Sequence, residues 1–158
     1  MLMPANRQDL LNEFEAAART VASANELMVN MSERLHHELA RYNWVGFYLP
    51  APDEPETLVL GPFSGSFTPH DRIPYTQGLC GAVARSHQTV VVNDVAADPR
   101  YLQGSSTTKS EAVVPVLARQ KFVAELDINS YFANTFSPED VRFLESCSAI
   151  VGHYFEQH

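Results

Sequence analysis

Residues 110–130 read SEAVVPVLARQKFVAELDINS, and this stretch decides the fold because two runs of β-branched and aromatic residues flank a short turn. The runs predict an antiparallel hairpin. Side chains of the second run alternate between two faces. The apolar face holds Phe122, Ala124, Leu126 and Ile128. The other face holds Val123, Glu125, Asp127 and Asn129. The apolar face needs a core behind it, whereas the acidic face is either a pocket floor or open to solvent.

The composition fits one ordinary domain that spans residues 1–158. The chain is 45% hydrophobic and 19% charged, so it can bury a full core. It has no run of about eighteen apolar residues and no apolar leader, which predicts neither a membrane span nor a signal peptide and makes the cytoplasm the expected location. A net charge of -8 without a basic stripe argues against nucleic acid and anionic membranes as partners.

Helices are predicted at both ends, over residues 6–41 and 137–157. Apolar residues recur at helical spacing in both regions, and the first is either two helices or one interrupted helix. The second begins with a capping serine and a proline at the first helical position, Ser137 and Pro138. These helices flank a region of strands and loops over residues 43–130, and their pairing would suit a homodimer.

Cys80 lies in GLCG, where a short helix is expected to begin. A helix N-terminus favours a thiolate, which would make this thiol reactive; the alternative is a small buried side chain between glycines. The second cysteine, Cys147, falls on the apolar stripe of the C-terminal helix. The spacing predicts no disulfide, no metal site and no cofactor.

Six segments follow one another along the chain: NWVGFYL (43–49), LVLGPFSG (58–65), RIPYTQGLCGAVA (72–84), VNDV (92–95), SEAVVPV (110–116) and ELDINS (125–130). In order and spacing they resemble the GAF-domain proteins that are free methionine-(R)-sulfoxide reductases. The resemblance implies an α+β, GAF-like fold: a central antiparallel sheet of about six strands, with N- and C-terminal helices on one face and ligand-covering loops on the other.

The resemblance also implies a set of site residues. An aromatic pair of the reductases' pocket falls at Trp44 and Tyr48, a glutamate at Glu111, and two aspartates at Asp127 and Asn129. In that family the carboxylates hold the amino-acid substrate and assist protonation of the sulfoxide oxygen. A nucleophilic cysteine attacks the sulfoxide sulfur, and resolving cysteines then close a disulfide that thioredoxin reduces.

The chain departs from this pattern at its sulfur atoms. Counting back from Glu111 puts Gly104 where the nucleophilic cysteine belongs, and His70 stands where another family cysteine precedes RIP. Only the cysteine of GLCG, Cys80, remains, and Asn129 replaces an aspartate. Glycine offers no nucleophile, so covalent catalysis would have to pass to Cys80.

Three functions therefore stand beside one another. The leading prediction is a standalone GAF domain, with a sensor or regulatory role, that binds a small polar or amino-acid-like ligand through Trp44, Tyr48, Glu111, Asp127, Asn129 and His70. Such a domain would need a separate signalling partner. The alternatives are an active reductase that uses Cys80, and a dimerisation or interaction module with no ligand.

Overall fold

The computed structural model describes residues 6–67 and 70–158. Its elements, in chain order, are α1 (Arg7–Ala18), α2 (Ala24–Glu38), β1 (Trp44–Pro50), β2 (Thr57–Gly65), β3 (Arg72–Pro74), α3 (Gly78–Ser86), β4 (Val90–Val92), the short 3-10 helix η1 (Val95–Ala97), β5 (Ser110–Ala118), β6 (Lys121–Ser130) and α4 (Pro138–Gln157). The two helices α1 and α2 fill the N-terminal helical region, whose sequence left one interrupted helix as the alternative.

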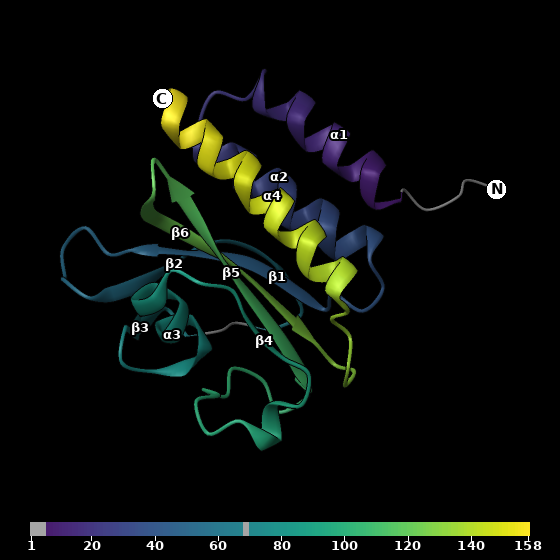
Figure 1. Cartoon of the computed structure of the whole chain (residues 1–158), viewed down its shortest axis with the longest axis vertical. Helices are drawn as coiled ribbons and strands as arrows, with labels where there is room; N and C mark the ends of the chain where they lie inside the picture. Colours follow the sequence, from purple (N-terminus) through teal and green to yellow (C-terminus); the bar gives the residue numbers. More distant parts are fainter. Residues whose placement is uncertain (1–5, 68–69) are drawn as a thin grey trace.

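One six-stranded sheet, ordered β3-β2-β1-β6-β5-β4, divides the molecule, and its paired strands run antiparallel. Helices α1, α2 and α4 lie on one face, and α3 lies with the loops on the other (Figure 1). The predicted α+β architecture is therefore confirmed: a six-stranded antiparallel sheet with the terminal helices on one face and loops on the other. β6 and β1 are the two central strands of the sheet. Their side chains project alternately toward the helices and toward the α3 side.

The predicted hairpin is β5 and β6, joined by a two-residue turn. Both turn residues, Arg119 and Gln120, have positive φ, of 50° and 67°, as a type I′ turn requires. Residues other than glycine rarely adopt positive φ. The backbone N–H of Arg119 donates to Glu156 of α4 at 2.8 Å, so the C-terminal helix holds the turn in place.

The prediction that Phe122 lies on the apolar face of β6 is wrong. Val116 pairs with Ala124 whereas Leu117 pairs with Phe122, so Val123 is an extra residue on β6. Such a bulge reverses the alternation of side chains on either side of it. Phe122 consequently packs on the α3 side, stacked on His87 with ring centroids 5.5 Å apart, while Val123 packs under the helices.

The larger core lies between the sheet and helices α1, α2 and α4. It includes the fully buried side chains of Phe14, Met31, Phe47, Leu126 and Cys147. Helix α4 approaches β5 closely because Gly152 has no side chain: a Cβ there would lie 2.3 Å from the carbonyl oxygen of Leu117. Figure 1 shows α4 laid along the sheet at this contact.

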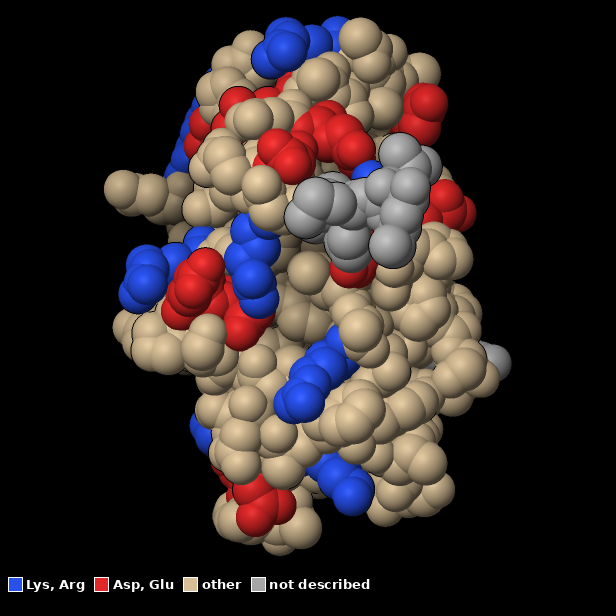
Figure 2. All heavy atoms as spheres, turned by 90° about the vertical axis from the view of Figure 1, so that its right-hand side faces the viewer, with Lys and Arg blue, Asp and Glu red and all other residues tan. Residues whose placement is uncertain are grey.

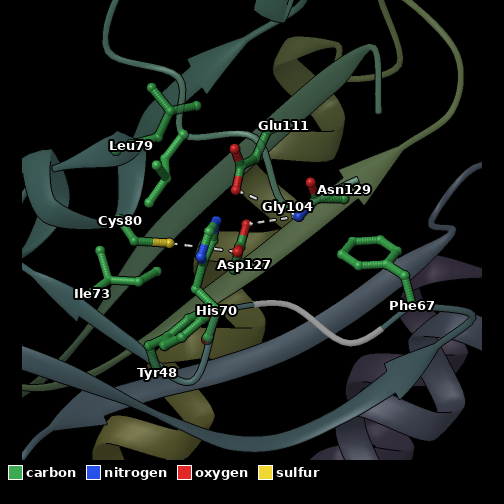
Figure 3. A pocket seen from close by; sticks show the side chains of 12 residues that line it. Tyr48, Phe67, His70, Ile73, Leu79, Cys80, Gly104, Glu111, Asp127 and Asn129 are labelled. Atoms are coloured by element: carbon green, nitrogen blue, oxygen red, sulfur yellow. Dashed lines mark hydrogen bonds between the residues drawn. The ribbon is translucent and has the colours of Figure 1, made fainter. Parts of the chain in front are cut away.

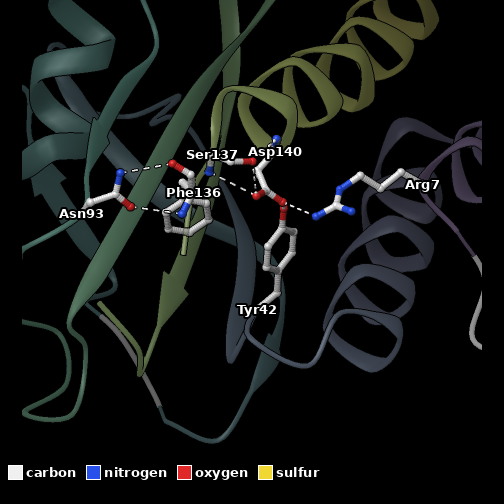
Figure 4. Close-up of polar contacts among 6 residues, drawn as sticks. All are labelled: Arg7, Tyr42, Asn93, Phe136, Ser137 and Asp140. Carbon is white, nitrogen blue, oxygen red and sulfur yellow. Dashed lines mark hydrogen bonds and ion pairs between the residues drawn. The ribbon is translucent and has the colours of Figure 1, made fainter. Parts of the chain in front are cut away.

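One carboxylate joins two N-terminal segments, α1 and the residues just before β1, to the start of α4. Asp140 accepts hydrogen bonds from the Arg7 guanidinium and, at 2.9 Å, from the Tyr42 hydroxyl (Figure 4). The same residue forms a capping box with Ser137, as the sequence of this helix start suggested. Asp140 is therefore both a helix cap and the link between α1, the start of β1 and α4.

Acidic and basic side chains both occur on the face of the molecule shown in Figure 2, and neither sign covers it alone. Exposed ion pairs such as Arg72 with Asp53, at 3.1 Å, contribute to this mixture. Within the described ranges, no helix is long and apolar enough to cross a bilayer.

We expect Asp140→Ala to lower the free energy of unfolding by about 2–4 kcal/mol, because it removes a helix cap and a charge-assisted bond at once. Burial alone would raise the pKa of Asp140, but hydrogen bonds from Arg7 and Ser137 outweigh it and hold that pKa below 3.8. The stabilisation is thus present above about pH 4 and is lost as the pH falls further. Urea unfolding at several pH values measures it.

Glu139→Ala is the matched control, because this exposed neighbour lies in the same helical turn. Its loss should cost less than about 0.5 kcal/mol. Equal effects of the two substitutions would contradict the role given to Asp140.

Candidate functional site

The acidic face of β6 is buried and forms the floor of a pocket. Asp127 and Asn129 project from β6, and Glu111 projects from β5, whose backbone pairs Glu111 directly with Asn129. The Asn129 amide donates to Asp127 at 3.3 Å and to Glu111 at 3.4 Å (Figure 3). Thr108 in turn donates to the Asn129 carbonyl oxygen at 3.1 Å. Of the two possibilities that the strand pattern left open, the structure therefore favours the pocket over solvent.

We call the cavity above this floor the cup. It is lined by Tyr48, Phe67, His70, Ile73, Gly78, Leu79, Cys80, Leu102, Gly104, Glu111, Asp127 and Asn129. Helix α3 contributes Leu79 and Cys80 to one wall, and other parts of the wall come from Tyr48 of β1, Ile73 of β3 and the loop residues Phe67 and Gly104 (Figure 3). Its volume is about 30 Å³, which is room for a single water-sized group.

A third carboxylate, that of Glu125, lies deeper on the same face of β6. Glu125 is 0% exposed, and neither of its carboxylate oxygens has a hydrogen-bond partner among the described residues. It lies against the thiol of Cys80. A carboxylate buried in this way is costly when charged, so the site favours its protonated form or a positively charged partner.

The pocket holds its carboxyl groups as weak acids. Burial raises the pKa of Glu111 and Glu125 well above 4.5, and the neighbouring Asp127 raises both further. Burial also raises the pKa of Asp127, although hydrogen bonds from its neighbours oppose this shift. None of the described residues that line the cup is lysine or arginine. The cup is consequently suited to a cation, or to giving a proton to a bound oxygen.

Cys80 lies in the first turn of α3, and its thiol donates to Asp127 at 3.5 Å. Burial raises the pKa of this thiol well above 9.0, and the nearby carboxyl groups raise it further. Both effects oppose the formation of a thiolate, which a helix N-terminus would favour. Cys147, the second thiol, is buried in the core on the opposite face of the sheet.

The predicted aromatic pair is brought together beside the cup. The ring centroids of Trp44 and Tyr48 lie 6.5 Å apart, and both residues are buried. Tyr48 lines the cup, but Trp44 is covered: Phe63 and Phe67 stack on it at 5.6 and 5.7 Å. The Trp44 Nε1 donor has no partner among the described residues. A ligand can reach this ring only if Phe67 moves.

Two loops are tied together over the cup. The imidazole of His70 bonds through Nε2 to the carbonyl oxygen of Gln103 at 2.8 Å, and the Tyr48 hydroxyl donates to the carbonyl oxygen of His70 at 2.9 Å. Gly104, beside Gln103, also lines the cup. The structure thus brings His70, Cys80 and Gly104 into the site together with the acidic floor, as Figure 3 shows.

Sequence reasoning missed part of the lining. Phe67, Ile73, Leu79 and Leu102 contribute its apolar surface. They lie in or beside loop segments of the kind that often line sites, but nothing in their residue types marks them individually. Glu125 was placed on the acidic face without a role, and its depth follows only from the covering helix α3.

Comparison with known proteins identifies the fold and its relatives. Residues 23–154 match the family described as the GAF domain, so the chain belongs to the GAF-domain family. Within that family it is strongly similar to free methionine-R-sulfoxide reductases. It is 33% identical to the enzyme of Escherichia coli over 141 residues, which cover 89% of this chain and 83% of the enzyme.

Two further similarities support this assignment. Bacillus subtilis Protein YtsP is 35% identical over 137 residues, or 87% of this chain and 83% of YtsP. The crystal structure of free methionine-R-sulfoxide reductase from Neisseria meningitidis, in complex with its substrate, superposes with a TM-score of 0.90 at 29% identity. That match covers 99% of this chain and 94% of the Neisseria chain.

We expect Glu125→Gln to stabilise the protein increasingly as the pH rises. The glutamate has a pKa of about 4.5 in the unfolded chain and a higher pKa when buried. Above about pH 4.5 the unfolded chain releases the proton while the folded protein still holds it, so the free energy of unfolding of wild type falls as the pH rises. Glutamine keeps the shape without this cost. From about pH 5 to pH 8 the variant should gain at least about 1 kcal/mol over wild type in urea unfolding with a metal chelator present.

The exposed residue Glu33 of α2 provides the control, as Glu33→Gln. Its difference from wild type should not change with pH over that range. A Glu125→Gln curve parallel to that of wild type would contradict the burial of an unpaired carboxyl group.

Proposed function

We propose that this protein is a GAF-domain sensor or regulatory domain that binds a small, amino-acid-like ligand in the cup and has lost the reductase chemistry of its relatives. The observation that carries the proposal is the placement of its sulfur atoms. Gly104, to which the resemblance assigns the position of the family's nucleophile, lines the cup, while Cys80 is a buried thiol of raised pKa. In this proposal Cys80 stays a protonated thiol beside the acidic floor when no metal is bound.

The second cysteine strengthens this proposal. Sulfoxide reduction by a thiol leaves the attacking cysteine oxidised, and a second thiol must reach it to form a disulfide and release water. Cys147 is 0% exposed in the helix-side core, with the sheet between it and Cys80. These two sulfurs therefore do not support an intramolecular disulfide.

The floor and the wall of the cup offer groups that would recognise an amino-acid-like ligand. Glu111 and Asp127 would accept hydrogen bonds from a ligand ammonium group, and the Tyr48 ring would contact its apolar part. Asn129 adds an amide donor for a carbonyl, carboxylate or sulfoxide oxygen. Since the cup measures about 30 Å³, the side chains of Phe67 and His70 must move aside to admit a ligand of this size.

One observation favours the second candidate function, a dimerisation or interaction module without a ligand. Phe63 and Phe67 stack on Trp44 and fill the space that a ligand would use. A groove of about 790 Å³, lined by residues of α1 and α4 including Ala18 and Ile150, would offer a surface for a second copy. A homodimer with a separate signalling partner is part of our proposal under either function.

We expect free L-methionine-(R)-sulfoxide to raise the melting temperature of the wild-type protein without being consumed. A ligand that binds only the folded state stabilises it by mass action, whereas turnover needs the missing thiolate. Thermal shift in EDTA measures binding, and chromatography of free methionine, with dithiothreitol as reductant and high protein concentration, measures turnover. Asp127→Asn should abolish the thermal shift.

The outcomes separate the candidate functions. Release of methionine that Cys80→Ser abolishes would replace our proposal with a reductase that uses Cys80. A melting temperature unchanged by the sulfoxide and by a panel of free amino acids would instead favour the interaction module.

We further expect Gly104→Cys to gain reductase activity. A Cβ at position 104 would meet only the edge of Phe67, at 3.5 Å, so the new thiol fits above the acidic floor. With dithiothreitol, methionine release should rise at least about tenfold over wild type. Ser106→Cys, in the same loop but exposed and outside the lining, should stay at the wild-type rate. Equal rates for both variants would count against our placement of position 104.

A further inference from the structure

The inner end of the cup gathers ligand atoms of a metal-binding type. Cys80, Glu111 and Asp127 come from α3, β5 and β6, and one thiol or carboxylate atom of each lies within 4.8 Å of the others. All three side chains are buried. Such a cluster alone can be satisfied by shared protons, so its meaning depends on the groups around it.

Glu125 supplies an independent observation. Its carboxylate is 0% exposed, both of its oxygens lack a partner among the described residues, and it lies against the Cys80 thiol. It shares the acidic face of β6 with Asp127, two residues along the strand. A fully buried carboxylate that interacts with the same thiol therefore lies beside the cluster. Buried acids are retained at a large cost unless they are paired or bind a cation.

We propose that the inner end of the cup is a binding site for a divalent thiophilic metal ion, best matched by Zn²⁺, with Cys80, Asp127 and Glu111 as ligands and Glu125 as the neighbouring carboxylate that orients the Cys80 side chain. Sulfur and carboxylate oxygen together are a ligand set that zinc accepts. Calcium and magnesium prefer oxygen ligands alone.

The spacing fits this ion. Zinc lies about 2.3 Å from a cysteine sulfur and about 2.0 Å from a carboxylate oxygen, so a tetrahedral site places those two ligand atoms about 3.5 Å apart. The Cys80 sulfur and the Asp127 oxygen are 3.5 Å apart. The cup volume of about 30 Å³ also admits one ion without any movement of the loops.

Binding exchanges protons for the metal. The Cys80 thiol gives its proton to solvent and its sulfur lone pair to the ion, and any carboxyl proton held at Glu111 is released in the same way. No oxidation or reduction takes place. The sequence alone did not predict this site because its ligands come from separate elements, with none of the short spacings that mark zinc motifs.

The metal site does not depend on the amino-acid-like ligand, although both would use Asp127 and Glu111. The closed cup fits the ion, and an open cup would fit the ligand, so the two should compete. Ligand binding is measured in EDTA and metal binding without amino acids, and either proposal can thus fail alone.

The test is cobalt substitution of the full chain. Protein stripped with EDTA and dialysed is titrated with CoCl₂; we expect a near-ultraviolet sulfur-to-cobalt charge-transfer band and the intense visible bands of four-coordinate cobalt, all removed by ZnCl₂. Cys80→Ser should lose the charge-transfer band, and Cys147→Ser should keep it. Glu125→Gln should weaken cobalt binding at least about tenfold.

A wild-type protein without the charge-transfer band, or a Cys80→Ser protein that keeps it, would overturn the proposal. Circular dichroism shows whether each variant is folded. If Cys80→Ser does not fold, wild type alone still decides: calorimetric titration with ZnCl₂ in buffers of different ionisation enthalpy should reveal proton release, and heats independent of the buffer would exclude thiolate ligation.

Discussion

The structure depends on a strand that separates an apolar environment from an acidic one. On its helix side β6 packs Leu126 and Ile128 against α4 and its neighbours, and on its other side it carries Glu125, Asp127 and Asn129. The helices cover one face of β6, and α3 with the loops covers the other, so the acidic side chains are shielded from bulk water. Their charge must be suppressed by protonation or balanced by something that binds. The pocket is a consequence of this arrangement.

The same separation governs what the sulfur atoms can do. Similarity to free methionine-R-sulfoxide reductases extends over nearly the whole chain. A shared scaffold does not carry a shared reaction, because covalent chemistry depends on individual atoms. Here one thiol is held among carboxyl groups and the other lies beyond the sheet, in surroundings that favour the protonated form of both.

Much of the fold could be predicted from the sequence, because its strongest signals are local. Alternation in β6, the Ser137 cap and the apolar stripes of the terminal helices each report the structure of their own segment. Phe122 shows the limit: one extra residue in a strand reverses its faces, and Val123 does not differ in type from its neighbours. The acidic floor could be predicted as a face, but its closure by Phe67 and His70 depends on loop contacts that no periodicity encodes.

The link between Arg7 and Asp140 also bears on how the chain reaches its fold. These residues are 133 positions apart, so α1 cannot make its ion pair during synthesis until α4 has been made. Closing so long a loop costs conformational entropy that local contacts do not repay, which places this step late in folding. Until then α1 lacks much of its cover, because it packs mainly on α4, whereas α2 can already pack on β1 and β2.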